Sequence, residues 1–98
     1  MKLEIAAKAE ADIRSIAAYT RKHYGLNQAN RYLDALYQLM EKIAVQPGLG
    51  HFRRDIPGAC KAITSGRHVV VYTVKNDTVY VARILHDQAD FKNHDLGQ

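Results

Sequence analysis

Five histidines are the first residues in this sequence that could carry chemistry, because imidazole binds metals and transfers protons near neutral pH. No pair of them has the HExxH spacing, and the single cysteine, Cys60, excludes the usual zinc clusters. His86, Asp90 and His94 are spaced four apart and would share one face of a continuous helix. The helical signals of that segment are weak, so we predict a solvated polar tail there and no metal site.

His86 also stands close to a cation, Arg83, and to two carboxylates, Asp87 and Asp90. A base, a cation and a carboxylate at the end of a strand could transfer protons or bind a phosphate. The structural alternative is that His86 and Asp90 form hydrogen bonds with the chain as it leaves the sheet. If this strand end carries out chemistry, His86 and Arg83 are the candidate catalytic residues; otherwise we expect none.

Arg83 places a cation in an otherwise apolar row of a strand. Strict alternation puts Val79, Val81 and Leu85 on its face. Two explanations stay open: Arg83 pairs with a carboxylate of the helices, or it faces a functional surface.

A cluster of basic residues lies in and beside an irregular segment, residues 47–59, that holds both prolines. The protein has 14 Lys and Arg against 10 Asp and Glu, a net charge of +4, which favours an acidic partner. The alternative is a solvated surface. We predict partner binding by the basic cluster together with Arg83, a set of five residues: Arg53, Arg54, Lys61, Arg67 and Arg83.

No Ser-His-Asp order, glycine-rich phosphate loop or paired-carboxylate spacing is present. The six tyrosines lie mostly at the spacing of core positions. We therefore interpret Tyr24, Tyr32 and Tyr72 as packing residues with a wet hydroxyl rather than as surfaces for stacking bases.

Three strands joined by tight turns are predicted over residues 60–64, 67–74 and 78–86, which are rich in Val, Ile, Tyr and Thr. The run from Val69 to Val74 is apolar on both alternating faces except at Thr73, so it should be the central strand, covered on both sides. Residues 2–6 alternate and could add an edge strand.

Two helices are predicted between these strand regions. The first begins at about Ala7, has its apolar stripe at helical spacing and stops at Gly25. The second begins with Asn27 as its N-cap and ends at Pro47. A connection this short makes them an antiparallel hairpin.

The predicted fold class is α+β: a short N-terminal strand and an antiparallel helical hairpin packed on a three- to four-stranded, mainly antiparallel sheet. A chain of 98 residues is long enough for one domain, residues 1–98. There is no apolar run of membrane-spanning length and no signal peptide at the N-terminus, and one cysteine fits a reducing compartment, so we expect a cytoplasmic protein without membrane contact.

Five motifs in order resemble the ParE branch of the ParE/RelE toxin superfamily, the toxins of bacterial type II toxin-antitoxin pairs. They cover nearly the whole chain: AxxDIxxIAxY (Ala9 to Tyr19), GLNQANRYL (Gly25 to Leu33), QPGLG (Gln46 to Gly50), SGRHVVVY (Ser65 to Tyr72) and RILHDQAD (Arg83 to Asp90).

The resemblance implies a helical hairpin on a small antiparallel sheet and a growth-inhibiting toxin without a cofactor. ParE-like toxins bind the A subunit of DNA gyrase and trap cleaved DNA without catalysis by the toxin. The resemblance also implies a cognate acidic antitoxin, ParD-like, through which alone operator DNA would be contacted. A basic protein with an apolar groove suits an acidic peptide that folds as it binds.

The RelE-like branch shares the fold but cleaves mRNA on the ribosome, which is the alternative function. Where an RNase member would offer an arginine, this chain has Val69, and only His86 matches. This departure favours the ParE branch. A small module that binds bare nucleic acid, and a relative that no longer inhibits growth, stay open as further alternatives.

Overall fold

Two helices and a four-stranded sheet make up the computed structural model, which describes residues 1–56, 60–89 and 91. Along the chain the elements are β1 (Lys2–Ile5), α1 (Ala7–Tyr24), α2 (Leu26–Val45), the 3-10 turn η1 (Pro47–Leu49), β2 (Lys61–Ser65), β3 (His68–Lys75) and β4 (Thr78–His86). Their order confirms the predicted α+β class. Neither helix combines the length and the apolar character that crossing a membrane requires, within the residues described.

The helical hairpin turns on a single residue, Gly25, which caps the end of α1 and the start of α2. Its φ of 90° is a conformation that side chains with a Cβ rarely adopt, and its N–H donates to the carbonyl of Arg21 at 3.0 Å. Because one residue serves both helices, α2 begins at Leu26. The prediction of Asn27 as N-cap is therefore wrong, since Asn27 lies inside the first turn of α2.

The strand order in the sheet is β1-β4-β3-β2. β1 pairs with β4 in parallel, which confirms the predicted edge strand, and the other pairings are antiparallel. Asn76 and Asp77 connect β3 to β4 with φ of 51° and 62°, as a two-residue hairpin turn requires. Gly66 has φ of 58° in the β2–β3 turn.

Two apolar clusters cover the two faces of the sheet. The larger one joins the helices to the sheet and includes Leu36 and Met40 of α2 with Val70 and Tyr72 of β3. The smaller one lies on the other face, where Val69 and Val71 pack with Ile56, Cys60 and Phe91 of the flanking segments. β3 is therefore covered on both sides as predicted, but only from Val69 to Tyr72. Val74 is 39% exposed, because β3 leaves the covered part of the sheet there.

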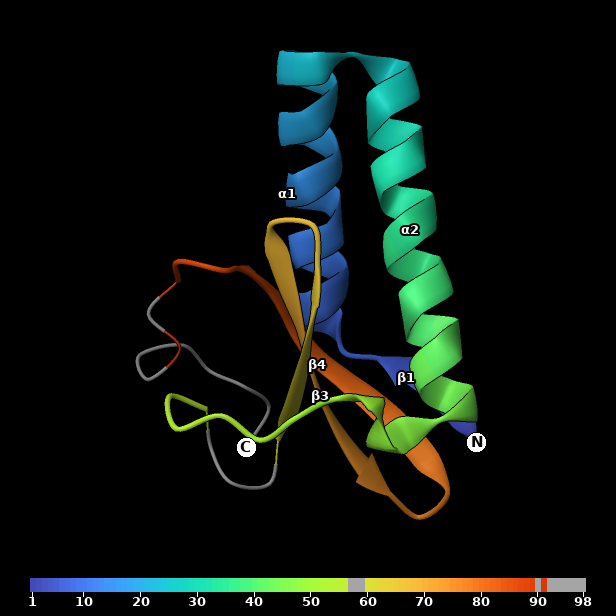
Figure 1. The fold of residues 1–98 in the computed structure, drawn as a ribbon. Helices are drawn as coiled ribbons and strands as arrows, with labels where there is room; N and C mark the ends of the chain where they lie inside the picture. The colour runs from blue at the N-terminus through green and yellow to red at the C-terminus, as the bar shows by residue number, and fades with distance from the viewer. Residues whose placement is uncertain (57–59, 90, 92–98) are drawn as a thin grey trace.

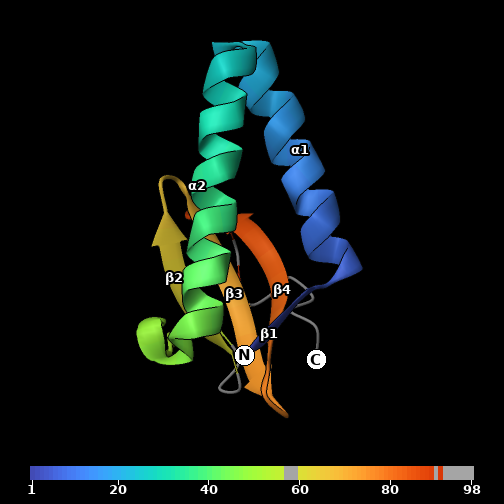
Figure 2. The same cartoon turned by 90° about the vertical axis from the view of Figure 1, so that its right-hand side faces the viewer.

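The connected ends of the helices extend past the sheet, beyond the β2–β3 turn (Figures 1 and 2). No strand lies beneath them, so apolar spacing there does not lead to burial. Tyr24 is 68% exposed and is not the packing residue that its spacing predicts. This overhang forms one wall of a groove beside the β2–β3 turn.

Candidate binding groove

A groove of about 520 Å³ lies between the helical hairpin, the β2–β3 turn and the end of β4. Most of its lining is apolar, and none of the described residues that line it is acidic. The helices contribute seven of these residues, and the turn and the strands contribute four: Ser15, Ile16, Tyr19, Thr20, Tyr24, Gln28 and Tyr32, then Gly66, Arg67, His68 and His86. Tyr19 is 60% exposed along this groove, so the groove is a surface that a partner can reach.

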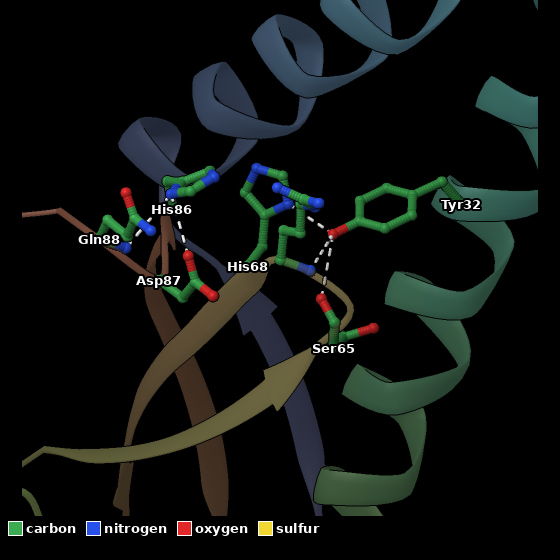
Figure 3. Close-up of polar contacts among 7 residues, drawn as sticks. Tyr32, Ser65, His68, His86, Asp87 and Gln88 are labelled. Carbon is green, nitrogen blue, oxygen red and sulfur yellow. Dashed lines mark hydrogen bonds and ion pairs between the residues drawn. The ribbon is translucent and has the colours of Figure 1, made fainter. Parts of the chain in front are cut away.

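Tyr32 joins α2 to the turn at the end of the groove (Figure 3). Its hydroxyl donates to the carbonyl of Ser65 at 3.0 Å and accepts the backbone N–H of Arg67 at 3.2 Å. The hydroxyl oxygen also contacts Nδ1 of His68. A Cβ on Gly66 would lie 2.7 Å from Cε1 of Tyr32, so a larger residue at that position would force the turn or the tyrosine to shift. Tyr32 packs as predicted, but its hydroxyl is engaged by protein groups.

His68 and His86 meet edge to face, with ring centroids 5.6 Å apart. Burial lowers the pKa of His68, and the nearby charge of His86 lowers it further, while Asp87 and Asp12 oppose this shift. The imidazole of His68 is therefore more often neutral than that of a free histidine. Burial likewise raises the pKa of the Tyr32 hydroxyl, which keeps it protonated as a donor.

His86 interacts mainly with the chain that follows it. Its Nδ1 accepts the backbone N–H of Gln88 at 3.2 Å and lies 3.1 Å from Oδ1 of Asp87 (Figure 3). These contacts fit the structural reading, in which His86 holds the chain as it leaves the sheet. Asp90 and His94 lie outside the described residues. Among residues 1–56, 60–89 and 91, no three His, Cys, Asp or Glu side chains are placed to hold a metal ion.

Arg83 pairs with Asp12 of α1, the first of the two explanations left open by its sequence. Its Nε and Nη2 donate to the carboxylate at 2.8 and 2.9 Å, and the N–H of Ile84 donates to the same carboxylate at 3.0 Å. The predicted apolar row is wrong, because the β3–β4 register shifts between Val71 and Tyr72. Val81 consequently packs with the helices, whereas Leu85 packs on the opposite face.

The other predicted partner-binding residues do not form one cluster. Arg67 lines the groove. Arg53 donates to Asp55 at 2.8 and 3.0 Å and lies 4.8 Å from the centroid of the Phe91 ring. Arg54 is exposed in the same loop, and Nζ of Lys61 lies 5.3 Å from the Phe52 ring centroid. A role in partner binding remains a prediction for each of these residues.

Sequence reasoning expected an apolar groove but missed three of its members, Tyr19, Tyr32 and His68, as site residues. Tyr19 falls at the border of the apolar stripe, which was the available signal that it lines a surface. A second signal for a site was the run Gly66-Arg67-His68 after a predicted strand. A turn at glycine can present the side chains that follow it to a neighbouring helix.

The fold has a counterpart among solved structures. A chain from a structure titled "Chromosomal ParDE TA system from P. aeruginosa" matches with a TM-score of 0.77, covering 88% of this chain and 95% of that chain at 19% identity. This match shows a shared α+β fold of two helices on a mixed sheet.

The family follows from the sequence comparisons. The model of the family described as "ParE toxin of type II toxin-antitoxin system, parDE" matches residues 3–91. This chain therefore belongs to the ParE toxin family and is the toxin component of a type II toxin-antitoxin system, as its motifs predicted.

Three curated relatives are similar to this chain over most of their own length. Toxin ParE1 of Caulobacter vibrioides is 31% identical over 90 residues, 92% of this chain and 93% of that protein. Toxin ParE of Escherichia coli is 33% identical over 90 residues, covering 88% of this chain and 84% of that protein. Toxin ParE1 of Mycobacterium tuberculosis is 29% identical over 83 residues, which cover 84% of this chain and 85% of that protein.

Proposed function

We propose that this toxin inhibits growth in the cytoplasm by binding the A subunit of DNA gyrase, without catalysing a reaction itself. The main support is the position of Arg83, which is held by Asp12 in a pair whose side chains are only 16% and 15% exposed. An RNase mechanism would need a cation free to stabilise the charge on a scissile phosphate. With Arg83 held by α1, His86 lacks the catalytic partner that the sequence suggested.

The test is a reconstituted supercoiling assay with purified toxin, gyrase and plasmid DNA, without ribosomes. We expect loss of supercoiling or accumulation of cleaved DNA as toxin is added. Full supercoiling at a large excess of soluble, folded toxin would contradict the gyrase proposal.

We further propose that a cognate, acidic, ParD-like antitoxin neutralises the toxin and supplies all contacts to operator DNA. The net charge of +4 and the open apolar groove, whose lining within residues 1–56, 60–89 and 91 includes no acid, support this proposal. Charge reversal of Arg53 and Arg54 should weaken antitoxin or gyrase binding, and unchanged affinity for both would remove these residues from the interface. In a gel-shift assay, the toxin should retard operator DNA only when antitoxin is present.

One observation favours the alternative, ribosome-dependent cleavage of mRNA. His68 and His86 lie side by side in the groove, and Arg67 is near them, so a base, an acid and a cation share one surface. If this alternative holds, His86→Gln should abolish toxicity, and induction of the wild type should leave cuts in mRNA at fixed codon positions. Retained toxicity of His86→Gln together with intact mRNA would exclude it.

A further inference from the structure

The groove is not uniform, because its basic side chains gather at one end. Ile16 and Tyr19 of α1 form an apolar wall, whereas Arg67, His68 and His86 stand at the end beside the β2–β3 turn. Arg67 and His86 are exposed and His68 is half-buried. A partner that fills this groove thus meets an apolar surface that ends in groups able to hold an anion.

The hydrogen bonds of Tyr32 determine which ring nitrogen of His68 can contact a ligand at the basic end of the groove. The phenol has one proton, and donating it to the carbonyl of Ser65 leaves its oxygen as acceptor for Nδ1–H of His68. In this arrangement neutral His68 carries its proton on Nδ1, and Nε2 is the ring nitrogen that Tyr32 does not engage. Protonation of His68 therefore adds a donor at Nε2 without breaking the contact with Tyr32.

Charged and titratable groups from every neighbouring element act on His68. The groups are Tyr32 from α2, Asp12 from α1, and His86 and Asp87 from the end of β4, while Arg67 precedes His68 in the turn. Asp12 is neutralised by Arg83, and Asp87 lies next to His86. Both described carboxylates near His68 therefore interact with another side chain. A partner can supply a carboxylate that pairs with His68 itself.

We propose that an amphipathic helix of the antitoxin fills this groove and places a carboxylate between Arg67, His68 and His86, so that binding takes up a proton. This subsite rests on the proposed neutralisation by an acidic antitoxin and specifies where one acid of that antitoxin binds. A carboxylate within about 4–6 Å of an imidazole favours its charged form, which reverses the effect of burial in the free protein. A rise of one unit in the pKa of His68 on binding corresponds to about tenfold tighter binding at low pH.

The experiment is calorimetric titration of the toxin with its cognate antitoxin at pH 5.5 and 7.5, repeated at pH 6.5 in two buffers of different ionisation enthalpy. We expect at least about fivefold tighter binding at pH 5.5, and net proton uptake at pH 6.5. His68→Gln and His86→Gln should each reduce both effects. His51→Gln is the matched control, because His51 is an exposed histidine that does not line the groove, and it should keep the wild-type pH dependence.

The outcomes separate the subsite from the function on which it rests. Tight binding that does not change with pH, or a pH dependence unchanged in both groove variants, overturns the subsite and leaves neutralisation intact. Absence of antitoxin binding overturns the proposed neutralisation itself. A single-stranded RNA oligonucleotide is the competing probe. If it shifts the NMR signals of His68 and His86 while the antitoxin does not, the site binds phosphate and the carboxylate proposal fails.

Discussion

Removing the carboxylate of Asp12 tests how much the fold depends on one ion pair between α1 and β4. In Asp12→Ala, Arg83 loses both hydrogen bonds to the carboxylate and the N–H of Ile84 loses its acceptor. Breaking a buried pair costs about 3–5 kcal/mol, and because these side chains keep 16% and 15% exposure we expect about 2–4 kcal/mol. Urea unfolding followed by circular dichroism should show a midpoint lower by about 1–2 M.

Asp55→Ala is the matched control, because it breaks the pair with Arg53, whose side chains are 36% and 38% exposed. Pairs that solvent reaches contribute about 0–1 kcal/mol, so this midpoint should hardly move. Adding Arg83→Met to Asp12→Ala should recover part of the loss, because it removes a largely buried charge that has lost the Asp12 carboxylate. Equal shifts for the two aspartate variants, or no recovery with Met, would refute the reasoning that the Asp12 carboxylate is a buried structural group.

Three further perturbations follow from the turns and hydroxyls around the sheet. Gly66→Ala should destabilise the protein by about 1–3 kcal/mol, because alanine is strained at φ of 58° and its Cβ would press on Tyr32; a melting temperature equal to wild type would argue against this. Tyr72→Phe should cost about 1–3 kcal/mol, since the Tyr72 hydroxyl accepts the N–H of Gly50 at 2.8 Å in a buried site, and unchanged urea stability would contradict that. Because the pKa of folded His68 is lowered, the unfolded chain binds more protons, so unfolding free energy should fall as pH drops through about 6.5. His68→Gln should flatten that decline, and an equally steep decline in the variant would assign it to other groups.

The elements that local pattern determines could be predicted from the sequence. Gly25 and Pro47 end the helices where expected, because backbone freedom and a missing N–H act within one turn of the chain. The edge strand Lys2–Ile5 was also recognisable from its alternation. These features need no knowledge of what packs against them.

The faces of the elements were harder to predict, because tertiary contacts decide them. Alternation along β4 fails at Ala82, between Val81 and Arg83, since the register shift in the β3–β4 pairing is made jointly by two strands. Tyr24 keeps helical spacing but has no sheet beneath it. The groove follows from how far the hairpin extends past β3, a distance that no local motif encodes.

Tyr32 connects the stability of this fold to its groove. By accepting the N–H of Arg67 and donating to Ser65, it holds the β2–β3 turn against α2, and the same contact orients His68. Loss of this hydroxyl should therefore loosen the β2–β3 turn and also change how strongly the groove binds protons. His68→Gln should change proton binding by the groove without loosening the turn. At the end of the groove where we propose that the partner binds, a helix, a turn and a strand end converge on one phenol oxygen, and such a fixed placement reduces the entropy that a docking partner must overcome.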